Sequence, residues 1–307
     1  MSRAAEFNPE LFEYDPGTSY PWLVHPSVTI AVVTWNRIEH TRALLASLDR
    51  CVHLPYRLLV VDNASEDGTR ELLRAVRDER PDTELVLNSA NLGLPRAHVQ
   101  IQERVEGDLV VVCDNDVELL SSYWLVHLQK AFHALRLAGL GDDVALGPRL
   151  LNCEEYGLLF GGRHETFPVA SEQNAPPRSS YAAVGKDDPD AARHLDEQVH
   201  VAWTEHLVGP IQAIPVALLK RLELREQYPT LIGGTDSFQS AEILRCGGRL
   251  GYVKNGPVAR HNDWPYSEDK LRHYEGLVGR RAPLDLHYLR WRWRHFWRGG
   301  RSRDSSE

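Results

Sequence analysis

Five short apolar runs alternate with stretches of helical periodicity in the first half of this chain, and the alternation limits the folds available to it. Continuous runs of valine, isoleucine and leucine are typical of strands covered on both faces. Strands separated by helices form a parallel sheet with helices packed on its two sides. We therefore expect an α/β fold with the strands VTIAVVTW (28–35), RLLVVDN (57–63), TELVLN (83–88), DLVVVC (108–113) and VALGPRLL (144–151).

Helices are expected after the first four of these strands. They cover 39–50, 70–79, 95–106 and 121–138, and Thr69 is expected to cap the second of them. After Gly162 the alternation ends, and residues 168–198, rich in proline, serine and aspartate, indicate a long mobile loop. Order resumes with strands expected at 199–204, 207–214 and 249–255 and helices expected at 215–225 and 236–246.

Composition narrows the classes of partner. The chain has 307 residues, 42% hydrophobic and 25% charged, which is ordinary for a soluble globular protein. Its formal net charge of -8 argues against nucleic acid as a partner. Residues 288–303, however, contain arginines and no acidic residue, interleaved with Trp291, Trp293 and Trp297. This tail predicts either a peripheral contact with the inner face of a membrane or packing on the acidic body, and in both cases a surface for homo-oligomer formation.

The cysteines and the first residues bear on location. The four cysteines are widely spaced and form no CxxC pair, so a reducing compartment fits better than a disulfide or zinc framework. The opening MSRAAEFNPELFEYDPG lacks the apolar core of a signal peptide, and no run approaches the roughly 18 apolar residues of a membrane span. We expect a cytoplasmic protein.

Polar residues gather where the expected strands end, and ligands of open α/β sheets bind at that edge. Asp114 and Asp116, at the end of the fourth strand, would repel each other unless a cation lay between them. A hard divalent cation such as Mg2+ or Mn2+ takes carboxylate ligands and bridges to substrate phosphates. Each polar residue alone is also compatible with a turn or helix cap, whereas together they indicate a nucleotide site. Besides Asp114 and Asp116, the residues at these strand ends are Thr34, Asn36, Arg37, Asp62, Asn63, Asn91, Gly93 and Arg96.

The absence of two common motifs narrows the chemistry further. No GxGxxG follows the first strand and no GxxxxGK[ST] occurs, which disfavours a dinucleotide-dependent dehydrogenase and a P-loop NTPase. VVTWNR, VVDNASEDGT, NLGLPRA and VVCDNDV, in this order, resemble the N-terminal half of family 2 glycosyltransferases of the GT-A fold. The D-N-D form is similar to the rhamnosyltransferase- and galactofuranosyltransferase-like branch. The resemblance covers 28–151 closely and 199–265 more loosely.

This resemblance implies a Rossmann-like, mostly parallel sheet with helices on both faces and a smaller mixed region on the acceptor side. It also implies sugar transfer from a nucleotide-sugar donor, with a metal held at a DXD motif. Thr34, Trp35 and Asn36 would flank the donor base. Asp62 and Asn63 would contact a uracil or thymine ring and its ribose.

The resemblance also implies a diphosphate and metal site. Arg96 would approach the diphosphate, with helix packing as the alternative. Asp114 would orient the ribose or a metal-bound water beside the ion, and Asp116 would ligate Mn2+ or Mg2+. His261, in VARHND, would be a further metal or diphosphate ligand, with ordinary packing as the alternative.

An inverting transfer needs a base that takes the proton of the acceptor hydroxyl as it attacks the anomeric carbon. In the family this base is an aspartate in the pattern E-D-x-D-L-x-x-R, and Asp236 of IGGTDSFQSAEILRCGG matches it. A plain N-cap is the alternative role. Thr235, Phe238 and Glu242 replace the Glu, Asp and Arg of the pattern, which leaves a retaining enzyme or a non-catalytic copy open.

We expect a lead-in over 1–27, a nucleotide-sugar-binding half over 28–151, an acceptor half over 152–265 that includes the loop 168–198, and a helical tail over 266–307. Trp203 and His206 would lie on the acceptor side. The leading hypothesis is a metal-dependent, inverting glycosyltransferase with a UDP- or dTDP-sugar donor and a glycan, lipid-linked or small-molecule acceptor. The alternatives are a non-catalytic nucleotide-sugar or carbohydrate-binding protein and a sugar nucleotidyltransferase, although TWNRIEHTR lacks the Gly-rich basic loop of the latter.

Overall fold

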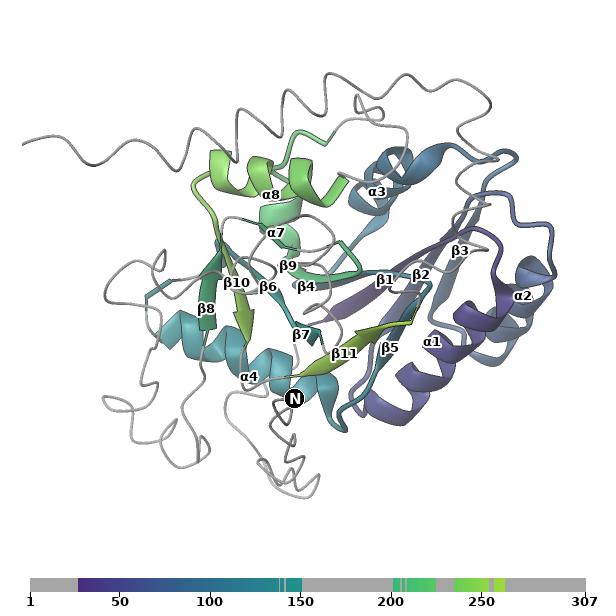
Figure 1. Ribbon diagram of the computed structural model, residues 1–307, viewed down its shortest axis with the longest axis horizontal. Coiled ribbons are helices and arrows are strands. Elements are labelled where there is room, and N and C mark those ends of the chain that lie inside the picture. The colour runs from purple at the N-terminus through teal and green to yellow at the C-terminus, as the bar shows by residue number, and fades with distance from the viewer. Residues whose placement is uncertain are drawn as a thin grey trace, which may run out of the picture.

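The computed structural model describes residues 27–137, 139–140, 142–150, 201–204, 206–207, 209–224, 235–253 and 257–262. The expected loop 168–198, the tail 266–307 and residues 1–26 of the lead-in lie outside these ranges, so what the sequence indicates for them stays a prediction. The described residues form one eight-stranded sheet, one three-stranded sheet and helices on both faces (Figure 1). None of the helices in this described part is long and apolar enough to cross a membrane.

Four strands of the large sheet are parallel and pair in the order β3-β2-β1-β4. Their bounds are Val28–Thr34 for β1, Arg57–Asp62 for β2, Thr83–Leu87 for β3 and Leu109–Asp114 for β4. Every residue of β1 is buried, as its continuous apolar run predicted. Because the strands run in one direction, their carboxyl ends meet at one edge, where Thr34 lies opposite Asp62 and Val33 opposite Asp114.

The other half of the large sheet is mixed. β9 (Ile211–Pro215) is antiparallel to β4 and to β6 (Val144–Gly147). β10 (Arg249–Val253) is parallel to β6, and β8 (Val201–Thr204) closes the order as an antiparallel edge strand. The α/β class and the mostly parallel sheet with a mixed second region are therefore confirmed.

A small second sheet has the order β5-β11-β7. β5 (Val117–Leu119) begins directly after Asp116, and β11 (Val258–His261) pairs with it antiparallel. β7 (Arg149–Leu150) pairs with β11 in parallel. The pairing brings the end of the described chain beside the turn that follows β4 (Figure 1).

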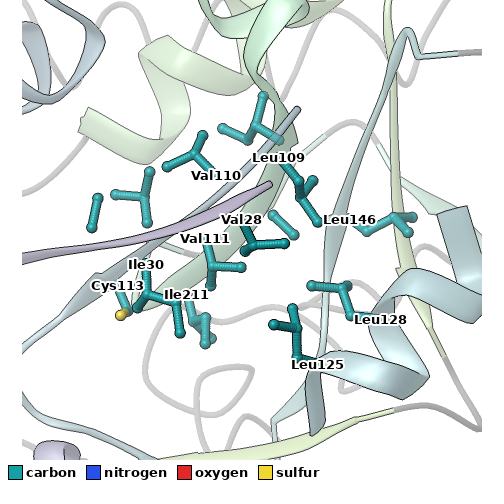
Figure 2. Close-up of a cluster of buried hydrophobic side chains, with 14 of the residues drawn as sticks. Val28, Ile30, Leu109, Val110, Val111, Cys113, Leu125, Leu128, Leu146 and Ile211 are labelled. Carbon is teal, nitrogen blue, oxygen red and sulfur yellow. The ribbon is translucent and has the colours of Figure 1, made fainter. Parts of the chain in front are cut away.

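Helices cover both faces of the large sheet (Figure 1). On one side lie α1 (Ile38–Cys51), α2 (Thr69–Glu79) and α4 (Trp124–Leu137). On the other lie α3 (Gly93–Arg104), α7 (Val216–Leu219) and α8 (Thr235–Arg245). One large core lies between these layers, and Figure 2 shows Val28, Ile30 and Val111 of the sheet gathered with Leu125 and Leu128 of α4. Burial of each such side chain contributes about 1.5–3 kcal/mol, which holds the strand ends in place.

One detail of the expected helices is wrong. Thr69 does not cap α2 but is its first residue, and the capping position is Gly68, with φ 92°. Asp67 supplies the acceptor instead, since its Oδ1 accepts hydrogen bonds from the backbone N–H of Thr69 at 3.1 Å and from its hydroxyl at 2.6 Å. A glycine can take the left-handed conformation that this entry to the helix requires.

Candidate active site

The turn between β1 and α1 is hydrogen-bonded to two neighbouring loops, those after β2 and β4. Asn36 and Arg37 both have positive φ, at 53° and 63°. The backbone N–H of Asn36 donates to Ser65 Oγ at 2.7 Å, and the N–H of Glu66 donates to Asn36 Oδ1 at 2.8 Å. Asn115 Nδ2 donates to the backbone carbonyl of Asn36 at 3.2 Å. Thr34, at the end of β1, is buried and its hydroxyl lies 3.2 Å from that of Thr41.

Asp62 lies at the end of β2, opposite Thr34 of β1. It is fully buried, and its Oδ1 accepts from the backbone N–H of Ser65 at 3.1 Å and from Arg70 Nε at 2.6 Å. Its Oδ2 has no hydrogen-bond partner among the described residues. A buried carboxylate oxygen without a partner is costly, so a ligand N–H would be well accommodated here.

Asn63 belongs to a buried amide network. Its Oδ1 accepts from Asn88 Nδ2 at 2.9 Å, and its Nδ2 donates to the carbonyl of Gly93 at 3.3 Å. Asn88 also exchanges hydrogen bonds of 3.0 and 2.8 Å with Gln100. The amide of Asn63 is thus used to join β2 to α3, and its predicted contact with the donor base stays a prediction.

The D-N-D turn after β4 places its three side chains differently. Asp114 is half-buried, and its backbone N–H donates to the carbonyl of Pro210 at 2.9 Å. Asn115 is buried, with its amide directed at Asn36 O and at Thr41 Oγ1, 3.1 Å away. Asp116 is 3% exposed and faces the small sheet. The asparagine therefore locks this turn to the turn after β1.

Asp116 lies between two cationic or potentially cationic groups. Arg37 Nη1 donates to its Oδ2 at 2.9 Å, and His261 Nε2 lies 3.2 Å from its Oδ1. Within the described ranges, no group of three or more His, Cys, Asp or Glu side chains is arranged to hold a metal ion. The metal-binding roles of Asp114, Asp116 and His261 stay predictions, and Asp116 and His261 are the two of them that lie in contact.

The pair fits a divalent ion. Asp116 Oδ1 and His261 Nε2 lie 3.2 Å apart, and both residues are buried. Mg2+ and similar ions are commonly bound by one or two protein side chains and completed by water and substrate phosphates. His261 was expected either as a ligand or as a packed residue; its contact with Asp116 is compatible with both, and its role as a ligand stays a prediction.

Asp236 lies in the first turn of α8 and its side chain is 24% exposed. Its Oδ2 accepts from the backbone N–H of Gly209 at 3.1 Å and lies 3.4 Å from His206 Nε2. A Cβ on Gly209 would come within 3.2 Å of Asp236 Cβ, a tight contact that would push the aspartate by a few tenths of an ångström. The helix N-terminus favours the ionised carboxylate. Asp236 is thus held in place yet reachable.

A buried polar chain lies beside α8 and joins α3 to β9. His98 Nδ1 lies 3.0 Å from Gln239 Oε1, and Gln239 Nε2 donates to Gln212 Oε1 at 2.7 Å. Gln212 in turn donates to the carbonyl of Leu207 at 3.1 Å. Burial lowers the pKa of His98, so its imidazole is neutral at neutral pH. Sequence reasoning missed these residues, since nothing local distinguishes them from other buried amides.

Three further predicted residues have described surroundings. Arg96 pairs with Glu103 two turns along α3, at 3.3 Å, and its approach to the diphosphate stays a prediction. Trp203 is buried in β8 with Arg249 over its ring, and its place on the acceptor side stays a prediction. Trp35 is half-buried directly after β1.

Residues 29–146, from β1 to β6, match the family described as Glycosyl transferase family 2. An uncharacterized glycosyltransferase of Bacillus subtilis (strain 168), YwdF, is 31% identical over 91 residues. That match covers 29% of this chain and 32% of the relative, so only about a third of the relative's length is shared. This segment is thus similar to glycosyltransferase family 2, in agreement with the resemblance of its four motifs.

Solved structures agree on the fold. A mannosyltransferase of Pyrobaculum calidifontis, in complex with GDP-Man and Mn2+, aligns with a TM-score of 0.55 at 19% identity, over 89% of this chain and 70% of that one. GalNAc-T7, with UDP, GalNAc and Mn2+, aligns with a TM-score of 0.54 at 15% identity, over 82% and 48%. TarS 1–349 of S. aureus, with UDP, gives 0.51 at 16% identity, over 91% and 75%. The fold is of the GT-A type.

Proposed function

We propose that this protein is a metal-dependent glycosyltransferase that takes a nucleotide-sugar donor. The observation that carries the proposal is the position of Asp116, held between Arg37 and His261 at the carboxyl edge of β4. The family 2 match over residues 29–146 supports it. The structural neighbours with bound UDP, or with GDP-Man and Mn2+, support the same reaction class.

The donor base would bind between β1 and β2. Uracil and thymine carry one imide N–H, and Asp62 Oδ2 is a buried acceptor without a partner in the described structure. We therefore favour a UDP- or dTDP-sugar. The rhamnosyl- and galactofuranosyltransferase-like branch stays our prediction, supported by the asparagine of the D-N-D turn.

Asp116 and His261 would hold Mn2+ or Mg2+, and the ion would supply positive charge to the departing diphosphate. Asp116 would bind it through Oδ1, because Oδ2 already accepts from Arg37. Asp114, two residues earlier at the end of β4, would orient the ribose or a water beside the ion.

Asp236 would be the base of an inverting transfer. Its carboxylate takes the proton of the acceptor hydroxyl, the hydroxyl oxygen bonds to the anomeric carbon, and the bond to the nucleoside diphosphate breaks. A carboxylate has about four acceptor positions, so bonds from Gly209 and a neighbouring His206 leave room for the acceptor. His206 would lie on the acceptor side, as expected from the sequence.

A second candidate is a non-catalytic nucleotide-sugar-binding protein. The departures at Thr235, Phe238 and Glu242 favour it, because they remove three of the charged residues that the family carries around the base. Glu242 here pairs with Arg245 along the same helix, at 2.8 Å, and so serves the helix surface.

One experiment separates the two. UDP-, dTDP- and GDP-sugars are tested with Mn2+ for a rise in melting temperature, since a ligand that binds only the native state stabilises it. The best donor is then followed for release of its nucleoside diphosphate. An enzyme binds and cleaves the donor, whereas a binding protein is stabilised without cleavage. If no nucleotide sugar raises the melting temperature, the proposed function is wrong.

A further inference from the structure

The backbone conformation just before α1 places the guanidinium of Arg37 against Asp116, the candidate metal ligand. Asn36 and Arg37 are consecutive residues other than glycine with left-handed φ, a conformation that side chains disfavour. It persists because several bonds hold it. Ser65, Glu66 and Asn115 bond Asn36, and the N–H of Ile38 donates to Asp67 Oδ2 at 2.8 Å.

The result of this turn is a close, largely buried ion pair. Arg37 Nη1 lies 2.9 Å from Asp116 Oδ2, and the two side chains are 20% and 4% exposed. Charges interact strongly where water is mostly excluded. The guanidinium therefore neutralises part of the negative charge with which Asp116 would attract a metal ion. It would also repel an ion bound at Oδ1, the carboxylate oxygen that faces His261.

We propose that Arg37 is a resident counter-ion of Asp116, which keeps the affinity for a divalent metal low until the donor diphosphate is present. The inference rests on the proposed function, because it takes the donor diphosphate as the group that raises the affinity for the metal. A diphosphate brings negative charge and strong acceptors, so it can satisfy both the ion and the guanidinium. Metal and donor would then bind together.

The role of Arg37 predicts how tightly variants at this position bind Mn2+. If Arg37 weakens metal binding in the absence of nucleotide, Arg37→Gln should bind Mn2+ at least about tenfold more tightly than wild type without UDP. Coupling between two ligands is reciprocal, so UDP should raise Mn2+ affinity by a smaller factor in Arg37→Gln than in wild type. Arg37→Lys keeps a positive charge and should stay close to wild type.

The test is a titration of Mn2+, followed by the electron paramagnetic resonance signal of the free ion, with and without UDP. Arg42→Gln is the matched control, because Arg42 lies on α1 near Glu39 and is 53% exposed, and it should behave as wild type. Equal or weaker Mn2+ binding by Arg37→Gln than by wild type without UDP would overturn the proposal.

The outcomes separate this proposal from the proposed function. Wild type that binds Mn2+ with UDP, together with an Arg37→Gln variant of unchanged affinity, contradicts the role of Arg37 alone. Failure of all variants to bind Mn2+ even with UDP contradicts the metal site itself and with it the counter-ion. If Arg37→Gln does not fold, Arg37→Lys and the wild type carry the test: a lysine variant with tenfold tighter binding without UDP overturns the proposal.

Discussion

The Nε2 atom of His261 lies 3.2 Å from Oδ1 of Asp116, although the two residues are far apart in the sequence. The small sheet explains the contact, because β11 pairs with β5 so that His261 is opposite Val117, the residue after Asp116. The backbone N–H of Asn262 also donates to the carbonyl of Asp116, at 2.8 Å. The ladder thus sets the distance between two candidate ligands.

Replacing His261 by alanine should weaken Mn2+ binding in the presence of UDP by about tenfold or more, since one of two protein ligands is lost. The Mn2+ titration described above measures it. His53→Ala is the control, because His53 is an exposed histidine beside Tyr123, in α1's C-terminal loop, and should leave the affinity unchanged. Unchanged affinity in His261→Ala would return His261 to a packing role.

Asp236→Asn should retain binding of UDP with Mn2+ while lowering donor turnover about 10²- to 10⁴-fold, because the amide cannot accept the proton. Turnover is measured as release of the nucleoside diphosphate. Glu242→Gln is the control on the same helix, where Glu242 pairs with Arg245, and it should stay near wild-type activity. Equal turnover in Asp236→Asn and wild type would remove Asp236 from the chemistry.

Asn88→Ala should lower the free energy of unfolding by about 1–3 kcal/mol, because it leaves the buried amides of Asn63 and Gln100 without a shared partner. Urea denaturation measures the change. Ser89→Ala, at the exposed neighbouring position, should stay within about 0.5 kcal/mol of wild type. A neutral effect of Asn88→Ala would mean that the network adds little to stability.

Acid should destabilise the protein partly through His127. Burial, followed by the charge of Lys130, lowers the pKa of His127 to about 4 from its ordinary value of 6.5. The unfolded chain therefore takes up this proton first, and stability is lost as pH falls from about 6.5 toward 4. Between pH 7.5 and pH 5 the loss due to His127 is about 2 kcal/mol.

His127→Gln should lack this loss. The free energy of unfolding of both proteins is measured in urea at pH 7.5 and at pH 5. Between these pH values the wild type should lose about 2 kcal/mol more than the variant. Parallel pH dependences of the two proteins would show that His127 keeps its ordinary pKa in the folded state.

Sequence patterns predicted the first four strands of the sheet well because most of their residues are buried. β1 to β4 begin and end within about two residues of the expected runs, since continuous β-branched runs between polar turns leave little freedom. β5 and β11 were missed. Strands as short as Val117–Leu119 carry no period of their own, and their pairing depends on contacts distant in sequence.

The direction of β9 also escaped prediction. An apolar run was expected at 207–214, but the strand is Ile211–Pro215 and runs antiparallel to β4. Periodicity reports burial and not strand direction, which depends on how the chain crosses between elements.

The candidate site was predicted in its parts but not in its contacts. Asp62, Asp116 and Thr34 gather at one edge because parallel strands place their carboxyl ends together. The pairing of Arg37 with Asp116 could not be anticipated, because it depends on two left-handed residues whose conformation is held by other loops. His98 and Gln239 were likewise outside the prediction, since α8 meets α3 only in the folded chain.

The proposed function depends above all on Asp116 holding a metal ion that binds the donor diphosphate. Isothermal titration of UDP into wild type and Asp116→Asn, with and without Mn2+, tests it most directly. Asparagine keeps the size of the side chain and removes the charge. We expect UDP to bind wild type at least tenfold more tightly with Mn2+, and Asp116→Asn to lose that gain while keeping its melting temperature within a few degrees. UDP binding that is independent of Mn2+ in wild type, or equally dependent on it in both proteins, would contradict the claim.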